Sequence, residues 1–290
     1  MPRQPVFFPS SFEPLERRRL MAATLQDGVL FVMGRPFSED FLIREEVSTQ
    51  SGENVIVVEI DAPFLDIPAT HQEFPAKDVN SVVVRAGGGD DKVDMAIATY
   101  AVPALAGTGP LTKGTRVDAG AGNDTVYGGT ARDLVLGGIG DDTVFGYNGN
   151  DWIDGGRGKD NLRGGGGNDT VFGGLDDDHI AGEFGDDVLF GGYGNDWVGS
   201  VGVGPLPNEP GDDIIAGGGG DDYLLGGEGR DHITGGAGRD TFFTDDQPGE
   251  WLDKQPDEPV IAPPPIRSVA GTLAPARIRP AAALLASADA

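Results

Sequence analysis

The chain has no cysteine and only three histidines among its 290 residues. Disulfide bonds are therefore excluded, and zinc or copper sites, which depend on thiolate or imidazole ligands, are disfavoured. No stretch of 18 apolar residues occurs, so we expect no transmembrane helix. Only 21 residues are Lys or Arg against 47 Asp or Glu, and the net charge of -26 argues against nucleic acid as a partner.

Glycine, in contrast, is abundant, with 48 residues, and recurs in a nine-residue repeat of the form Gly-Gly-x-Gly-x-Asp-x-apolar-x. Nine units follow one another from 119 to 199, four more run from 208 to 243, and an isolated unit begins at Ala86. The sixth position is aspartate in all fourteen units: Asp91, Asp124, Asp133, Asp142, Asp151, Asp160, Asp169, Asp178, Asp187, Asp196, Asp213, Asp222, Asp231 and Asp240. The eighth position is always apolar, from Val93 and Val126 to Ile233 and Phe242.

These residue types predict the shape of each unit. Glycine adopts positive φ angles, so the first six residues can form a tight turn, and the last three can form a short strand with the eighth side chain pointing inward. One unit cannot bury its apolar side chain alone, so the units must stack and share a core. Two units make a coil of 18 residues between two parallel sheets. We therefore predict an all-β chain that forms a right-handed parallel β-roll.

The repeat closely resembles the RTX (hemolysin-type) calcium-binding nonapeptide, which folds as a parallel β-roll. This resemblance implies that the cofactor is Ca²⁺, bound as several ions, and that the fourteen sixth-position aspartates are its candidate ligands.

The chemistry of the repeat supports calcium independently of that resemblance. Stacking brings turns 18 residues apart to about 4.8 Å from each other, so pairs such as Asp142 with Asp160 and Asp151 with Asp169 repel. Calcium takes six to eight oxygen ligands, which carboxylates and glycine carbonyls supply, whereas magnesium prefers rigid octahedral coordination. Residues 119–243 carry 23 acidic and 6 basic side chains. We therefore expect calcium to drive the folding of residues 86–243.

Some units depart from the pattern and are expected to be weaker sites. Ala131 and Asp176 replace the glycine at position four, and Tyr147 and Glu183 replace the glycine at position two. A side chain at positive φ costs about 1 kcal/mol. We also expect Asp91 to matter little, because the sequence indicates that the roll breaks after it.

Residues 1–23 are predicted to be a disordered leader for export or sorting. Prolines interrupt their short apolar stretch and the arginines follow it, unlike an ordinary secretory signal. The segment Phe12-Glu13-Pro14-Leu15-Glu16-Arg17-Arg18-Arg19-Leu20-Met21-Ala22-Ala23 resembles the LEPR motif of exported planctomycete proteins, with Leu20-Met21 where Leu-Leu is usual. A short basic disordered segment without a sorting role is the alternative.

Residues 24–118 are predicted to be a β-rich N-terminal cap that includes the first repeat at 86–94 and a loop at 95–118. Alternating segments at 28–33, 54–60 and 80–85 are typical of strands. A stack of repeats exposes an open core and sheet edges at its end, so a cap is required. The alternative is an independent small β-sandwich.

The roll itself is assigned to residues 119–243, with 200–207 as an inserted loop that need not break the stack. Residues 244–290 are assigned to a C-terminal cap and a disordered tail rich in Pro and Ala. Phe242 and Phe243, which directly precede this segment, are expected to fill the end of the core.

Calcium binding in a secreted or cell-surface protein is thus the predicted function, and a surface adhesion or matrix module with an unknown partner is the alternative. A secreted hydrolase is less favoured. The sequence has no His-Glu-x-x-His, Gly-x-Ser-x-Gly or phosphate-loop motif, and close carboxylates such as Asp151 and Asp154 arise from the repeat itself. We predict no enzymatic activity. His179 and His232 are expected to face solvent, and the ninth-position pairs Tyr127–Phe145 and Phe172–Phe190 to stack.

Overall fold

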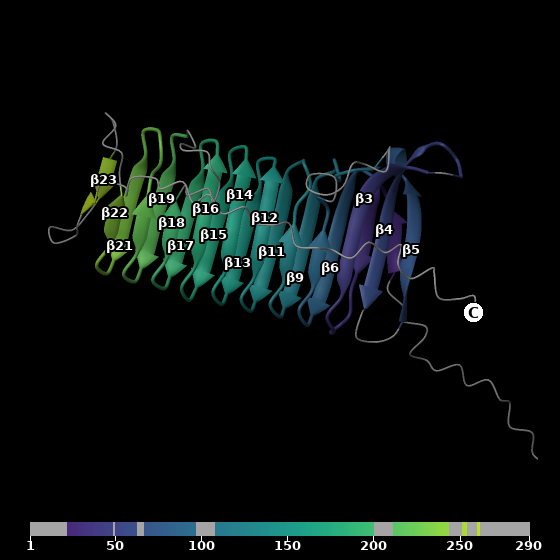
Figure 1. Ribbon diagram of the computed structural model, residues 1–290, viewed down its shortest axis with the longest axis horizontal. Coiled ribbons are helices and arrows are strands. Elements are labelled where there is room, and N and C mark those ends of the chain that lie inside the picture. Colours follow the sequence, from purple (N-terminus) through teal and green to yellow (C-terminus); the bar gives the residue numbers. More distant parts are fainter. Residues whose placement is uncertain are drawn as a thin grey trace, which may run out of the picture.

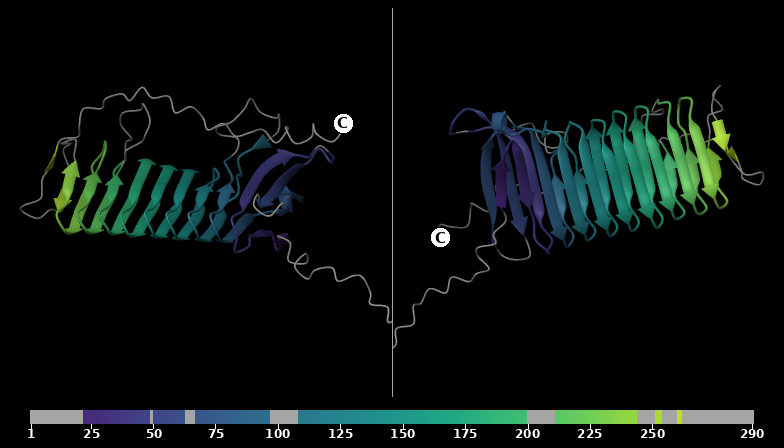
Figure 2. Two further views of the ribbon diagram at one scale, coloured as in Figure 1. Left: turned by 60° about the horizontal axis from the view of Figure 1, so that its bottom comes forward. Right: turned by 180° about the vertical axis from the view of Figure 1, so that it is seen from behind.

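The computed structural model describes residues 22–48, 50–62, 67–96, 108–199, 211–243, 251–253 and 260–261. They form an elongated stack of coils, with the N-terminal strands at one end and the repeat units along the rest (Figure 1). Two layers of strands run the length of the stack (Figure 2). Among the described residues no helix is long and apolar enough to cross a membrane.

The two sheets contain eleven and thirteen strands. The first sheet consists, in spatial order, of β1 (Ala22–Gln26), β2 (Val29–Met33), β6 (Ser81–Gly88), β9 (Thr115–Ala121), β11 (Asp133–Ile139), β13 (Trp152–Arg157), β15 (Thr170–Leu175), β17 (Val188–Tyr193), β19 (Ile214–Gly219), β21 (His232–Ala237) and β23 (Trp251–Asp253). The second consists of β24 (Val260–Ile261), β22 (Thr241–Phe243), β20 (Tyr223–Leu225), β18 (Trp197–Gly199), β16 (His179–Phe184), β14 (Asn161–Gly166), β12 (Thr143–Asn148), β10 (Thr125–Tyr127), β7 (Lys92–Asp94), β3 (Asp40–Val47), β4 (Asn54–Ala62) and β5 (Ile67–Pro75), with β8 (Thr108–Gly109) paired to β3.

Strand pairing follows the predicted period of 18 residues. Val135 pairs with Ile153 and Ile153 with Val171, each in parallel register. Across the predicted loop at 200–207, Leu189 pairs with Ile215 and the stack continues without a missing rung. The loop itself lies outside the described residues. The all-β parallel roll is therefore confirmed.

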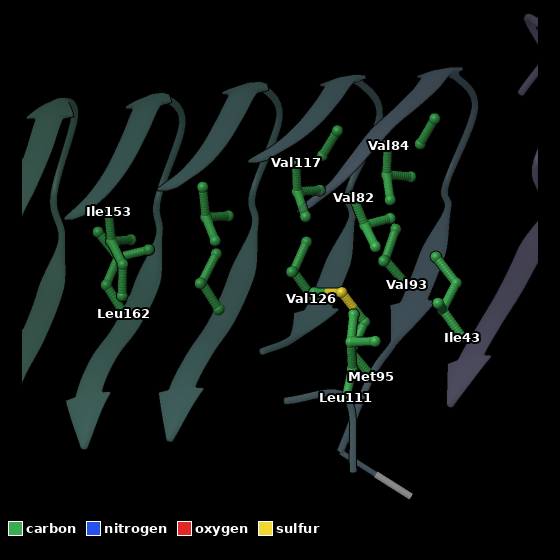
Figure 3. Close-up of a cluster of buried hydrophobic side chains, with 14 of the residues drawn as sticks. Ile43, Val82, Val84, Val93, Met95, Leu111, Val117, Val126, Ile153 and Leu162 are labelled. Carbon is green, nitrogen blue, oxygen red and sulfur yellow. The ribbon is translucent and has the colours of Figure 1, made fainter. Parts of the chain in front are cut away.

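The eighth-position side chains form one continuous core between the sheets. Every one of them, from Val93 to Phe242, is at most 1% exposed. Figure 3 shows this row meeting the core of the N-terminal strands, where Met95 and Leu111 fill the space beside Val126. Each unit thus contributes one side chain to a core that only stacking can complete.

The N-terminal strands continue the roll rather than forming a separate β-sandwich. β2 pairs in parallel with β6, and β3 pairs in parallel with β7, so both sheets extend through this region. Antiparallel pairing of β1 with β2, and of β3 with β4 and β4 with β5, ends the two sheets. A short 3₁₀ turn, η2 (Ala76–Asp78), precedes β6.

Two expectations about the ends of the repeat block were wrong. The roll does not break after Asp91, because Val93 on β7 pairs directly with Val126 on β10. Residues 95–118 are not wholly a loop, since they include β8 and the start of β9. The register is kept after this interruption because β9 pairs in parallel with β6, with Val84 opposite Val117.

The C-terminal segment also differs from expectation. Within residues 244–290, β23 pairs with β21 and β24 pairs with β22, so both sheets continue past the repeats, and β24 lies in the part, residues 254–290, that was predicted to be disordered. Of the two phenylalanines, only Phe242 lies in the core. Phe243 stacks on Tyr223 on the outer face, with ring centroids 6.3 Å apart, because adjacent strand residues point to opposite faces.

Candidate metal centre

The sixth-position aspartates lie in two rows of stacked turns, one along each edge of the roll. Row one contains the turns that lead from the first sheet to the second, with Asp91, Asp124, Asp142, Asp160, Asp178, Asp196, Asp222 and Asp240. Row two contains the turns that lead back, with Asp133, Asp151, Asp169, Asp187, Asp213 and Asp231. All fourteen are buried, at 0 to 3% exposure.

One oxygen of each carboxylate is used to join consecutive coils. The backbone N–H of Asp142 donates to Oδ1 of Asp160 at 2.8 Å, and that of Asp160 donates to Oδ1 of Asp178 at 2.9 Å. The same bond links Asp151 to Asp169 at 2.7 Å in row two. The predicted neighbours are therefore in contact, and Oδ1 of every sixth-position aspartate is already occupied.

The other oxygen is left without a protein partner. Oδ2 is buried and accepts no hydrogen bond in ten of the described aspartates: Asp91, Asp124, Asp142, Asp151, Asp160, Asp169, Asp178, Asp187, Asp196 and Asp222. An unpartnered buried carboxylate oxygen is costly, and each such atom needs an explanation. Because it recurs with the period of the repeat, it is a property of the site and not an accident of one turn.

Glycine at position one keeps open the space beside Oδ2. A Cβ at Gly137 would lie 2.5 Å from Oδ2 of Asp142 and 2.6 Å from the carbonyl oxygen of Gly155, one coil further on. At Gly173 the corresponding oxygens are Oδ2 of Asp178 and the carbonyl oxygen of Gly191. Each turn thus presents a carboxylate oxygen and a neighbouring coil's carbonyl to one small space.

Side chains alone do not complete such a site. Within the part of the chain that the structure describes, no three His, Cys, Asp or Glu side chains converge as a metal cluster. The other groups beside Oδ2 are backbone carbonyls, such as that of Gly155 beside Asp142, and oxygen donors suit a hard cation rather than zinc or copper.

Burial disfavours the charged form of these carboxylates. Desolvation raises the pKa of Asp142 and of Asp160 to about 7, and that of Asp178 to about 8. In Asp142 and Asp178, the charges of the neighbouring aspartates in the row raise the pKa further. A bound dication would supply the missing charge and reverse this shift.

Asp133 is the exception in row two. Its Oδ2 accepts the backbone N–H of Gly129 at 2.8 Å, so it has no free oxygen to offer. Its Oδ1 accepts both the backbone N–H and the hydroxyl of Thr115, at 3.0 and 2.8 Å. Thr115 occupies the sixth position of a coil that the sequence pattern does not reveal.

The substituted glycines behave partly as predicted. Tyr147, Asp176 and Glu183 have φ angles of 72°, 79° and 70°, so they adopt the left-handed conformation that glycine would adopt there. Ala131 does not, and the expectation of strain at this position was wrong. Its turn, which ends at Asp133, is folded differently, without the positive φ angles that most of the other turns have at positions two and four.

The sequence analysis missed a further unit at the start of row one. Residues 34–42 match the repeat only at Gly34 and Phe41, yet the backbone N–H of Glu39 donates to Oδ1 of Asp91 at 2.8 Å. Glu39 therefore occupies the sixth position, and its side chain is fully buried. In place of an open space, the Arg35 side chain lies beside its carboxylate, with Nε 3.3 Å from Oε1.

Asp91 is also better integrated than predicted. Its backbone N–H donates to Oδ1 of Asp124 at 2.7 Å, although the two residues are 33 positions apart rather than 18. The reason given for a minor role of Asp91, a break in the roll after it, is therefore wrong, because its backbone and Oδ1 have the same contacts as those of the other members of row one.

The outer faces of the sheets carry the predicted aromatic stacks. The rings of Tyr127 and Phe145 lie 5.3 Å apart, and those of Phe172 and Phe190 lie 4.9 Å apart, each pair within 9° of parallel. His232 is exposed as expected, whereas His179 is only half-exposed because it packs against the ring of Trp197.

The spaces at the position-one glycines, the unpartnered Oδ2 atoms and the neighbouring backbone carbonyls suit the coordination of calcium. Comparison with known proteins points to the same ion. A comparison with curated proteins finds no match. The RTX calcium-binding nonapeptide repeat matches in four copies, at residues 115–144, 145–180, 172–199 and 209–242. Asp91 and Glu39 lie outside these matches but continue the same row. Repeats of this type bind several Ca²⁺ ions, and these segments of the chain match that repeat.

Proposed function

We propose that Ca²⁺ ions bind between stacked turns of this protein and that the chain is exported and folds on meeting calcium outside the cell. The observation that carries the proposal is the periodic row of buried, unpartnered Oδ2 atoms, which lie beside an open glycine position in every such turn except those of Asp91 and Asp124, where Ala86 and Ala119 stand instead. The aspartates with this geometry are the ligands, and Asp133 is the weakest of the fourteen because its Oδ2 is already bonded.

Charge explains why folding depends on the metal. Residues 119–243 have a net charge of -17, and the fold buries a carboxylate in every unit of this block. Without cations, the folded state must either keep these groups protonated or tolerate unpaired buried charge. Calcium removes that penalty, so metal binding and folding are one equilibrium.

Export follows from the calcium concentrations on the two sides of the membrane. Extracellular calcium modules bind with Kd of about 10⁻⁴ to 10⁻³ M, so such sites fill outside cells and stay empty in the cytosol. The segment at residues 12–23 that resembles the LEPR motif fits this route but lies largely outside the described residues. No enzymatic activity is part of the proposal.

Circular dichroism during a calcium titration tests the metal-dependent folding. In excess chelator the roll should give a coil spectrum, and calcium should convert it to β structure, whereas equal concentrations of magnesium should not. A spectrum that is fully β in chelator, or full rescue by magnesium, would refute the proposal.

Fractionation of the native organism tests the location separately. The protein should be found in the envelope or the medium. Recovery of a folded, calcium-loaded form from the cytoplasm would contradict export while leaving calcium binding intact.

A further inference from the structure

Two departures from the repeat consensus lie together on the second sheet. Tyr147 and Glu183 both replace the glycine of position two, and both pair in register with Gly165, which lies between them. Each keeps the left-handed backbone of the glycine it replaces. This conformation costs about 1 kcal/mol per residue and is often retained where a side chain serves a function.

Tyr147 completes a cluster of three aromatic rings. Its ring centroid lies 6.5 Å from that of Tyr127 and 6.2 Å from that of Phe145, which themselves stack. All three side chains are half-buried, so part of each ring remains accessible. The cluster forms one wall beside Gly165.

Arg163 and Glu183 contribute the polar groups on the other side. The Arg163 guanidinium lies over the Phe145 ring at 5.4 Å, and its Nη1 is 3.7 Å from Oε1 of Glu183. The Nε–H of Arg163 is buried and has no hydrogen-bond acceptor. Arg163, which has an unsatisfied donor, and the Glu183 carboxylate therefore line the same hollow.

The absence of side chains at Gly164 and Gly165 leaves a hollow between these walls. It has a volume of about 250 Å³ and is lined by the aromatic cluster, the two glycines, Arg163 and Glu183. Pockets for drug-sized molecules are typically about 300 to 1,000 Å³, so this one suits a single small ring.

The charges of the hollow select among possible ligands. An anion would meet Glu183 and a strongly acidic protein, and a cation would meet Arg163. A hydroxyl group both donates and accepts hydrogen bonds, so a ring bearing several hydroxyls can satisfy Arg163 and Glu183 together. Its apolar face can pack on the aromatic wall. We propose that this hollow binds a neutral sugar ring, as the end or a unit of an extracellular glycan.

The hollow depends on the roll, because its residues come from three consecutive turns of row two. Tyr147, Gly165 and Glu183 are the second residues of the turns that end at Asp151, Asp169 and Asp187. Insofar as the proposed calcium sites order these turns, sugar binding will require calcium. The sugar site itself requires only that the coils be stacked.

The test uses substitutions that restore the repeat consensus. Tyr147→Gly and Glu183→Gly remove side chains from the hollow and also relieve the positive-φ strain, so neither should destabilise the roll. Asp176→Gly is the matched control, because it relieves the same strain at a row-one turn, on the opposite edge. The full chain, in saturating calcium, is titrated with neutral and with acidic oligosaccharides, and circular dichroism verifies that each variant is folded.

We expect the wild type and Asp176→Gly to bind a neutral oligosaccharide equally well. Tyr147→Gly and Glu183→Gly should bind it at least about tenfold more weakly, because the first loses a stacking contact and the second loses a charged hydrogen bond. Failure of the wild type to bind any neutral sugar, a preference for acidic sugars, or unchanged affinity in both variants would overturn the proposal. If the roll forms and binds sugar without calcium, the calcium-dependent folding fails and the sugar site stands.

Discussion

The N-terminal end of the roll and its repeat block use the same coil but treat the sixth position in different ways. In the coils that carry Asp142 and Asp160, this position holds a buried carboxylate with one unpartnered oxygen. In the end coil it holds Glu39, whose carboxylate is paired with Arg35 of the same turn. The chain thus supplies its own cation at the end of row one, whereas further along, under the proposed function, a cation from solution takes that place.

Along the other edge, the end coils avoid the charge altogether. The residues in register with Asp133 are Thr115, then Val82, then Leu30, and both apolar side chains are completely buried. Stacking therefore does not require aspartate. The comparison indicates that the eighth-position core determines the fold, whereas the sixth position determines whether a coil needs metal.

The largest effect that distinguishes the repeat block from the end coils should be the response of the calcium-free fold to acid. Burial raises the pKa of Asp178 to about 8, from an ordinary value of 3.8. A raised carboxyl pKa stabilises the calcium-free fold fully below about pH 4, and this stability is lost as the pH rises through about 6 to 8. In chelator, the repeat block should gain β structure when the pH falls from 8 to 4.5, as measured by circular dichroism.

The calcium-loaded protein should respond in the opposite direction, because protons compete with the metal for the same oxygens. Its affinity for calcium should fall over the same range. A calcium-free chain that loses structure on acidification would contradict this account of the buried carboxylates.

Removal of the internal cation should weaken only the N-terminal end. Arg35→Gln leaves Glu39 buried without its partner, and breaking such a pair costs about 3 kcal/mol or more. Unfolding of the region before residue 96 by urea should shift to lower concentration. Lys77→Gln is the control, since its ion pair with Glu53 is exposed and worth about 0 to 1 kcal/mol. Equal shifts in both variants would show that Arg35 has no special role.

Substitution within row one should weaken the calcium-loaded state. Asp160→Asn retains an acceptor at Oδ1 for Asp142 but removes the charge, so we expect the sites on both sides of Asp160 to weaken. With Kd of about 10⁻⁴ M and about 1 mM calcium, two sites contribute roughly 3 kcal/mol. Calorimetry should show fewer ions bound, whereas Asp133→Asn should bind as many as the wild type. Equal losses in the two variants would refute the role assigned to Oδ2.

The same comparison now applies to Asp91. Because its backbone donates to Asp124 and its Oδ2 is unpartnered, Asp91→Asn should reduce calcium binding, but by less than Asp160→Asn does, since Ala86 places a Cβ at position one of its turn. Calorimetry that counts the calcium ions bound by each of the two variants decides this. An ion count in Asp91→Asn equal to that of the wild type would support the original expectation that Asp91 matters little.

The smallest effect is expected from a single methyl group. Gly137→Ala places Cβ in the space between Oδ2 of Asp142 and the carbonyl of Gly155 and should remove one site, worth roughly 1.4 kcal/mol at about 1 mM calcium. In Gly219→Ala the nearest atom to the new Cβ is 3.5 Å away, on the ring of Tyr193, so this control should bind normally. Unchanged binding by Gly137→Ala would exclude the glycine space as the ion's position.

The sequence was sufficient to predict the coil, the core and the stacking of Asp142 on Asp160, because the strict nine-residue period fixes all three. It was insufficient where the period is interrupted. The 15 extra residues between Asp91 and Asp124 conceal their contact. Glu39 and Thr115 were missed because their turns lack the glycines and the aspartate by which a unit is recognised.

The local departures were predictable in part. Tyr147 and Glu183 keep the glycine backbone, since their neighbours in the stack fix the coil around them. Ala131 does not, because the chain enters this coil after an interruption and Leu111 contributes a backbone hydrogen bond to Thr130. Such a contact depends on the path of a non-repeating segment, which no periodic pattern predicts.

Hydrogen exchange measured along the chain, in chelator and in calcium at neutral pH, tests whether the repeat block needs the metal to fold. We expect amides of the repeat block, such as those of β13 to β17, to exchange rapidly in chelator and to become protected in calcium. Amides of β2, β3 and β4 should be protected in both conditions. Protection of the repeat block in chelator equal to that in calcium would contradict the claim that its buried aspartates need the metal.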